Sequence, residues 1–243
     1  MLKSQRHQLI LRKLQTDGAV QVSELSGIMD VDPVTIRRDL AQLEHNGSLL
    51  RVHGGAVVRE GAGLRSKASE SASRIAEAAA RAVPDGSVVF LGPGTLTAEI
   101  VPVLQTFSHL TIITNALDVA WGLTRQRQHT LHVIGGQVGA GFGIYSDPET
   151  LRRIRADFVI LEADGLDAER GFTHDDRETA NMARALFALN AQTIILIPPE
   201  RLGRAGALFI APAGEIDVLI TGREADNPPL WDLSELGIRV VLT

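Results

Sequence analysis

The chain has 243 residues, a formal net charge of −5 and no cysteine, so disulfides, thiolate metal sites and cysteine nucleophiles are excluded. Its 44% hydrophobic and 22% charged residues are typical of a folded protein, and no apolar run approaches the ~20 residues of a membrane-spanning helix. With no signal-peptide core at the N-terminus, we expect a cytoplasmic protein.

Charge is distributed unevenly along the chain. Residues 1–60 hold 8 Lys/Arg and 7 Asp/Glu, whereas residues 61–243 hold 16 Lys/Arg and 22 Asp/Glu. A near-neutral head and an acidic body predict two modules with different roles.

The head begins with a pattern for two short helices. Apolar residues between positions 9 and 14 recur at helical spacing, and Asp17-Gly18 ends this first helix. Residues 19–22 read as a short extended piece. Ser23 is expected to cap the second helix, because its hydroxyl can accept from amides of the first turn.

A third helix and a hairpin complete the head. Asp32 is the predicted N-cap, and Pro33 follows where its missing N–H costs nothing. The helix is expected to run to about residues 46–47. Apolar residues between positions 49 and 57 flank His53-Gly54-Gly55, which predicts a two-stranded hairpin with a Gly-Gly turn.

The third helix separates two faces. At 100° per residue, its apolar positions form one core stripe, and another face carries residue types that reach base edges and phosphates in a major groove. With the preceding helix and the turn at residues 30–32, this predicts a helix-turn-helix, and the hairpin makes it a winged one. The core stripe is Ile36, Leu40 and Leu43. The predicted DNA-contacting residues are Ser23, Thr35, Arg37, Arg38, Gln42, Arg51 and His53.

Two roles are assigned within that set. Thr35 and Arg38 are expected to read bases, whereas Arg37 and Arg51 mainly hold the DNA backbone. The alternative is that Arg37 and Arg38 are a solvated surface pair, as is common on exposed helices.

The body alternates strands with helices. Residues 58–71 are rich in Gly, Ser, Ala and charge and read as a linker. Short apolar strands separated by helices then predict a mostly parallel sheet covered on both faces. We therefore expect a DNA-binding domain over 1–57, a linker over 58–71 and an α/β effector-sensing and oligomerisation domain over 72–243. The predicted strands are Val88–Leu91, Leu110–Thr114, Leu131–Ile134, Phe158–Leu161, Thr193–Ile197, Val218–Thr221 and Ile238–Leu242. Helical patterns include Ile75–Val83, Leu96–Leu104 and Glu178–Leu189.

Four predicted strands end in turns with ligand-binding character. The segment 92–97 offers backbone amides and Thr hydroxyls at the start of a helix, which makes an anion site. The turns at 114–115, 135–136 and 164–165 should lie at the same edge of a parallel sheet. The candidate ligand-binding residues at these turns are Gly94, Thr95, Thr97, Asn115, Gly135, Gly136 and Asp164, with Glu178 as a further candidate for lining the pocket.

The head resembles the signature of the DeoR-type bacterial transcription regulators. The matching runs are VSELS from Val22, VDPVTIRRDL from Val31 and LRVHGGA from Leu50. The resemblance continues more weakly through the body. It implies a sensor domain with a fold similar to phosphosugar isomerases and CoA transferases, a phosphorylated sugar as effector, and a homodimer or larger homo-oligomer on double-stranded operator DNA.

The body departs from that family pattern at several positions. The pattern implies a Lys near Ala72 and a Lys at Arg201, where the arginine can still pair with a phosphate. It also implies Asp at Gly92, Pro198 and Gly222 and Thr at Leu96. Most acidic and lysine ligands are thus absent. We therefore expect ordinary sugar phosphates to bind weakly if at all, a different organic anion to be any tight ligand, and binding to depend on Arg201.

Three readings of the whole chain remain. The first is a DNA-binding repressor of a carbohydrate-related operon, modulated by a small anionic effector and needing no cofactor. The second is an isomerase or transferase with an added head. It is disfavoured because such enzymes have no need of a winged helix-turn-helix, and because the carboxylates missing at Gly92, Pro198 and Gly222 also weaken any proton transfer. The third keeps the body only for oligomerisation.

Three further features complete the sequence-based expectations. A metal site built from His129, His132 and His174 is set aside, because no HExxH or His-x-His spacing with a carboxylate supports it, and these histidines, His174 included, read as solvated loop residues. Glu162 and Asp164, at the end of a predicted strand, are expected to point to opposite sides of the sheet and so to form no obvious acid/base pair. Trp121 and Trp231 are expected in the core or an interface.

Overall fold

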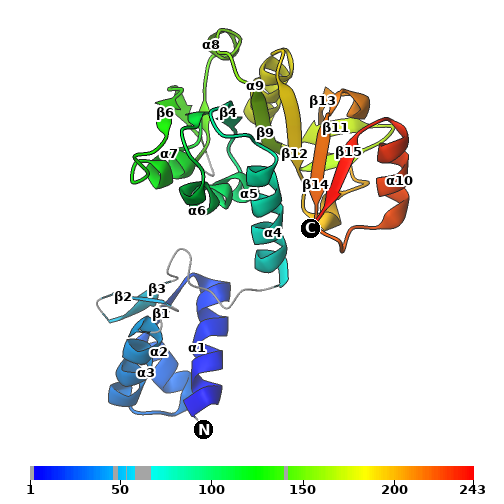
Figure 1. Cartoon of the computed structure of the whole chain (residues 1–243). Coiled ribbons are helices and arrows are strands. Elements are labelled where there is room, and N and C mark those ends of the chain that lie inside the picture. The colour runs from blue at the N-terminus through cyan, green and yellow to red at the C-terminus, as the bar shows by residue number, and fades with distance from the viewer. Residues whose placement is uncertain (1–2, 46–48, 53, 58–66, 140–141) are drawn as a thin grey trace. The chain divides into compact units, whose positions relative to one another are not determined.

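A computed structural model describes residues 3–45, 49–52, 54–57, 67–139 and 142–243. The chain divides into two compact units, Met1–Ala68 and Ser69–Thr243. Figure 1 shows the elements of each unit along the chain. No helix in the described part of the chain is long and apolar enough to cross a membrane.

The first unit is a winged helix-turn-helix, as the sequence predicts. Its three strands form an antiparallel sheet in the order β1-β3-β2, so the predicted hairpin gains the extended piece before α2 as a third strand. Its elements are α1 (Lys3–Asp17), β1 (Ala19–Gln21), α2 (Val22–Met29), α3 (Pro33–His45), β2 (Leu50–Val52) and β3 (Gly55–Val57).

One helix start is as predicted and one is not. The Val34 N–H donates to Asp32 Oδ1 at 2.7 Å, so Asp32 begins α3. Helix α2, however, begins at Val22, and the predicted cap Ser23 lies inside its first turn. The Val22 N–H donates instead to the Gly54 carbonyl in the wing at 2.9 Å, which satisfies one of the amides that a helix start leaves open.

The small core of this unit is apolar, with one buried ion pair beside it. The predicted stripe of α3 is buried, packed with Ile10, Leu14, Leu25 and Leu49. Asp39 on the same helix is 3% exposed. Its carboxylate accepts from Arg6 Nε at 2.7 Å and lies 3.2 Å from His7 Nε2, which ties α3 to α1.

The second unit contains a seven-stranded parallel sheet in the order β15-β14-β12-β9-β4-β5-β6. Each strand was predicted from an apolar run, to within one residue at either end. The strands are β4 (Val88–Leu91), β5 (Thr111–Thr114), β6 (Thr130–Val133), β9 (Phe158–Glu162), β12 (Gln192–Leu196), β14 (Val218–Thr221) and β15 (Arg239–Leu242).

Both faces of the sheet are covered. Phe90, Val159 and Ile195 pack on one side in a cluster that includes α9, and their chain neighbours Val89, Ile160 and Ile194 pack on the other in a cluster that includes α4. Strands buried on both faces explain the unbroken apolar runs. The helices are α4 (Lys67–Arg81), α5 (Thr95–Ala98), α6 (Ile100–Val103), α7 (Leu117–Leu123), α8 (Pro148–Leu151), α9 (Arg177–Phe187) and α10 (Asn227–Glu235).

Two helix boundaries differ from the prediction. Helix α4 begins at Lys67, so residues 67–71 of the predicted linker are helical; residues 58–66 lie outside the described part of the chain. The helix predicted over 96–104 is divided into α5, α6 and a 3-10 turn over Leu104–Thr106.

Five short strands were not predicted. β10 (Gly165–Asp167), β11 (Gly171–His174) and β13 (Leu208–Ala211) form a separate antiparallel sheet. β7 (Gln137–Val138) and β8 (Ile144–Tyr145) form a hairpin. The first of these two sheets matters for function, because β11 brings His174 beside the carboxyl end of β9.

Candidate functional site

The exposed face of α3 carries most of the predicted DNA-contacting residues. Arg37, Arg38 and Gln42 are exposed and Thr35 is partly so, whereas the core stripe on the other side of the helix is buried. Gln42 accepts from Lys3 Nζ at the start of α1. Ser23 is exposed in the first turn of α2. The arrangement leaves the guanidinium groups of α3 accessible to phosphates and base edges.

The wing carries a paired cation. Arg51 on β2 has its Nη1 3.9 Å from Glu44 Oε2, and its backbone N–H donates to Glu44 Oε1 at 3.0 Å. Glu44 therefore lowers the net positive charge that Arg51 presents. The predicted contact at His53 lies outside the described residues.

One residue suited to DNA contact was missed in the sequence. Val34, in the first turn of α3, is 52% exposed. Apolar side chains at the start of a recognition helix contact thymine methyl groups. The signal was available, because Val34 lies off the core stripe of Ile36 and Leu40.

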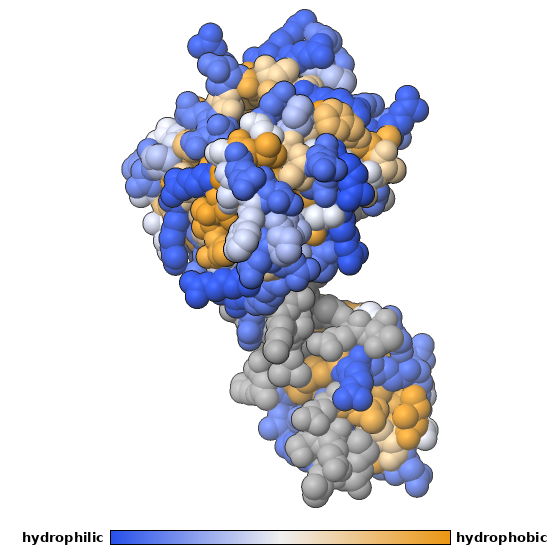
Figure 2. Space-filling view, turned by 90° about the vertical axis from the view of Figure 1, so that its right-hand side faces the viewer, coloured by the Kyte–Doolittle hydropathy of each residue, from blue (hydrophilic) through white to orange (hydrophobic). Residues whose placement is uncertain are grey.

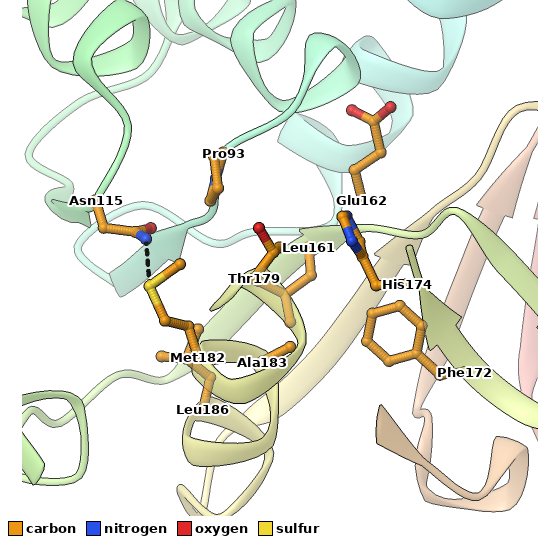
Figure 3. A pocket seen from close by; sticks show the side chains of 10 residues that line it. All are labelled: Pro93, Asn115, Leu161, Glu162, Phe172, His174, Thr179, Met182, Ala183 and Leu186. Carbon is orange, nitrogen blue, oxygen red and sulfur yellow. Dashed lines mark hydrogen bonds between the residues drawn. The ribbon is translucent and has the colours of Figure 1, made fainter. Parts of the chain in front are cut away.

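The second unit has a pocket at the carboxyl ends of its parallel strands. Residues that follow β4 and β5 meet the end of β9 there, and β11 and α9 complete the wall (Figure 3). This is the edge where α/β sheets place ligands. The pocket is lined by Pro93, Asn115, Leu161, Glu162, Phe172, His174, Thr179, Met182, Ala183 and Leu186.

Glu162 occupies the loop that was predicted to bind an anion. The Leu96 N–H donates to Glu162 Oε2 at 2.8 Å, and the Thr95 hydroxyl donates to Oε1 at 3.2 Å. Burial raises the pKa of Glu162, although these two hydrogen bonds and Arg201 favour the carboxylate. The predicted anion site is thus filled by a side chain of the protein itself.

Asp164 and Arg201, both predicted ligand contacts, bind each other. Arg201 Nη1 donates to Asp164 Oδ1, and His174 Nδ1 lies 3.1 Å from Asp164 Oδ2. His174 is therefore a partly buried member of this cluster, and the expectation of a solvated loop residue is wrong. Asp164 also raises the pKa of Glu162. Residues two apart on a strand share a face, so the expectation that these two carboxylates point to opposite sides is wrong.

Asn115 faces into the pocket with one polar atom unpaired. It is fully buried; its Nδ2 donates to the Ile144 carbonyl at 2.9 Å and lies 3.2 Å from Met182 Sδ (Figure 3). Its Oδ1 has no hydrogen-bond partner among the described residues. A buried acceptor without a partner is costly, and a ligand that donates to it relieves that cost.

The other predicted ligand contacts lie outside the pocket lining. Thr97 is buried and donates to the Gly94 carbonyl at 2.9 Å, which commits its hydroxyl to the loop itself. Gly135 and Gly136 are exposed after β6, and Glu178 is exposed at the start of α9. Of the nine predicted residues, Asn115 is the one that lines the described pocket directly.

Packing explains two of the departures in the body. A Cβ at Gly92 would lie 2.7 Å from Leu161 Cδ2, and a Cβ at Gly222 would lie 2.5 Å from Ser71 Oγ. At both positions a larger residue would require the neighbouring side chain to move. Leu96 is buried in the core between the sheet and α4.

Two other side chains were expected in the core or an interface. Trp121 and Trp231 are 67% and 72% exposed, so neither belongs to the core. The described residues also contain no group of three or more His, Asp or Glu placed to hold a metal ion.

Both parts of the chain match known families. Residues 6–61 match the DeoR-like helix-turn-helix domain, and residues 67–223 match the DeoR C terminal sensor domain. The chain belongs to the DeoR family. It is therefore a DNA-binding transcriptional regulator, and the alternative of an enzyme with an added head is not supported.

Relatives in the DeoR family align over almost the whole chain. The glycerol-3-phosphate regulon repressor of Escherichia coli K12 is 28% identical over 94% of this chain and 93% of its own length. The transcriptional repressor CsqR of the same strain is 29% identical over 89% of this chain and 86% of its own length. Ribose 5-phosphate isomerase A from Methanocaldococcus jannaschii aligns with a TM-score of 0.39 at 14% identity, over 54% of this chain and 52% of its own.

Proposed function

We propose that this regulator represses a carbohydrate-related operon in the bacterial cytoplasm and that a small carbohydrate-derived effector in the sensor pocket controls its affinity for DNA. The observation that carries the proposal is that one chain contains both an accessible Thr/Arg face on α3 and, in its other unit, a pocket at the carboxyl edge of the parallel sheet. The relatives named as repressors support the direction of regulation.

Within the DNA interface, Thr35 and Arg38 read bases, and Arg37 and Arg51 contact phosphates. The test begins with DNA enriched by the full-length protein from a random pool and measures affinity by fluorescence anisotropy at fixed salt. Arg38→Ala is expected to cost about 1–3 kcal/mol and to relax specificity at one position. Arg81→Ala is the matched control, because Arg81 is exposed and pairs with Glu77 on α4. Equal affinities of wild type and Arg38→Ala would contradict the docking of α3.

The regulator acts as a homodimer or larger assembly. One winged helix buries too little surface for tight binding, and symmetric dimers meet symmetric operators. The exposed Trp121, with the Arg125 guanidinium 5.7 Å from its ring centre, and the exposed Trp231 provide apolar surface for contact between copies. Light scattering at micromolar concentration checks this, and a species of 26.1 kDa alone would reject it.

A further inference from the structure

We propose that Glu162 determines the ligand class of the sensor pocket: its carboxylate takes the place of a ligand phosphate, so the pocket accepts a neutral, hydroxyl-rich ligand and rejects the phosphorylated form. The inference rests on the proposed function in taking this pocket as the effector site. It differs from the sequence-based expectation of an anionic ligand anchored on Gly94, Thr95 and Arg201.

The first step is that the Leu96 amide and the Thr95 and Thr97 hydroxyls of loop 92–97 already have acceptors within the protein. Both carboxylate oxygens of Glu162 accept hydrogen bonds from this loop, one from the Leu96 amide and one from the Thr95 hydroxyl. The Thr97 hydroxyl donates to the Gly94 carbonyl. A phosphate placed here would have to displace Glu162 and then lie beside its negative charge.

The second step is that Glu162 fits the loop closely. A Cβ at Gly94 would lie 2.3 Å from Glu162 Oε2 and 2.9 Å from Glu162 Cβ. Gly94 also adopts φ = 152°, a conformation that side chains disfavour. The carboxylate thus lies directly against the bare backbone of Gly94, so an anion bound to that backbone would meet it.

The third step concerns the nearby cation. Arg201 is the residue expected to bind a phosphate, but its Nη1 is bonded to Asp164. Asp164 also lies within 3.1 Å of His174 Nδ1, so the pair is part of a wider cluster. With two carboxylates facing one guanidinium, a dianionic phosphate would bring excess negative charge into the site.

The fourth step identifies what the pocket can bind. Asn115 lines it, and the buried Oδ1 of this residue has no partner among the described residues. An unpaired acceptor of this kind calls for a donor on the ligand. Hydroxyl groups donate without adding charge, which favours an unphosphorylated sugar or sugar alcohol. The pocket has room for about one water molecule as it stands, so its walls must move apart when such a ligand binds.

The test uses the full-length protein and one conservative change. In Glu162→Gln, the amide retains an oxygen for the Leu96 N–H and an N–H₂ group that can donate to Thr95, so the loop remains supported while the charge is removed. Glu169→Gln is the matched control, because Glu169 is exposed in the turn between β10 and β11. Isothermal titration calorimetry with inorganic phosphate, and with pairs of glucose and glucose 6-phosphate and of ribose and ribose 5-phosphate, measures binding.

Glu162→Gln is expected to bind at least one phosphate-bearing probe tenfold or more tightly than wild type or Glu169→Gln do. Gaining or losing one charge-assisted hydrogen bond changes the binding affinity by about one to two powers of ten. No gain in the variant, including no binding at all, would overturn the proposal, as would wild type binding a phosphate ester as tightly as Glu162→Gln does. Affinity for the enriched DNA is measured separately, so a failure there counts against the proposed function and not against the role of Glu162.

Discussion

The buried contact between α1 and α3 predicts a large and local effect of Asp39→Asn. The Asp39 side chain is 4% exposed, while those of Arg6 and His7 are 13% and 18% exposed. Removing one partner of a fully buried ion pair costs about 3–5 kcal/mol. Because asparagine keeps one acceptor and water reaches both basic groups, we expect a loss of ~2–3 kcal/mol in the stability of the first unit.

Hydrogen exchange measured by mass spectrometry can read this loss in the full-length protein. Both tryptophans, Trp121 and Trp231, belong to the second unit, so their fluorescence reports that unit alone. Peptides covering Lys3–Asp17 and Pro33–His45 should exchange faster in Asp39→Asn by about the factor that ~2–3 kcal/mol implies, which is roughly 30- to 150-fold. Peptides of the parallel sheet should be unchanged.

The control is Asp17→Asn, which removes the exposed ion pair of Asp17 with Lys13. Such surface pairs contribute about 0–1 kcal/mol. If Asp39→Asn accelerated exchange no more than Asp17→Asn does, the buried pair would not anchor α3.

The pH dependence gives a second check. Burial raises the pKa of Asp39, but Arg6 and His7 outweigh it and leave the pKa lowered. The advantage of wild type should therefore be full at neutral pH and disappear as pH falls through this lowered pKa.

Three further predictions follow from the contacts of single residues. Because burial raises the pKa of Glu162, wild type loses stability as pH rises through that pKa, whereas Glu162→Gln does not. Urea titrations followed by tryptophan fluorescence should therefore show the free energy of unfolding of the variant rising relative to that of wild type from pH 5 to pH 8. Parallel pH profiles of the two proteins would contradict this. Gly94→Ala should destabilise the second unit by ~2 kcal/mol or more in the same titration, since its Cβ meets Glu162 and its φ is strained; an unchanged midpoint would show that the loop relaxes freely. Glu44→Gln should strengthen DNA binding by roughly two- to fivefold at low salt, because it removes the ion pair between Glu44 and Arg51. An affinity equal to that of wild type in anisotropy titrations would mean that Arg51 does not contact DNA.

The parallel sheet was predictable because burial on both faces leaves a direct mark on the sequence. Runs such as Phe158–Leu161 are too short for helices and do not alternate, which is the pattern of a strand covered on two sides. The small antiparallel sheet left no such mark. Its strand β11 reads Gly171-Phe172-Thr173-His174, and tertiary pairing with β13, rather than local preference, makes it a strand.

The pocket was predictable only in part. Turns after parallel strands pointed to the right edge of the sheet, and Asn115 does line the pocket there. The occupant of loop 92–97 was not foreseen, because the contact joins Glu162 to Thr95 and Leu96 across two neighbouring strands. Alternation places residues two apart on the same face of a strand, so the expectation of opposite sides for Glu162 and Asp164 misapplied that rule.

The direct contact between Gly94 and Glu162 also restricts how this protein can diverge. A Cβ at 94 would overlap the carboxylate of Glu162 and lie 2.9 Å from its Cβ, and the φ of 152° strains any side chain at 94 whatever the space. Shortening residue 162 removes only the overlap with the carboxylate. Lineages that change ligand class through this pocket should therefore vary at 162 and keep glycine at 94.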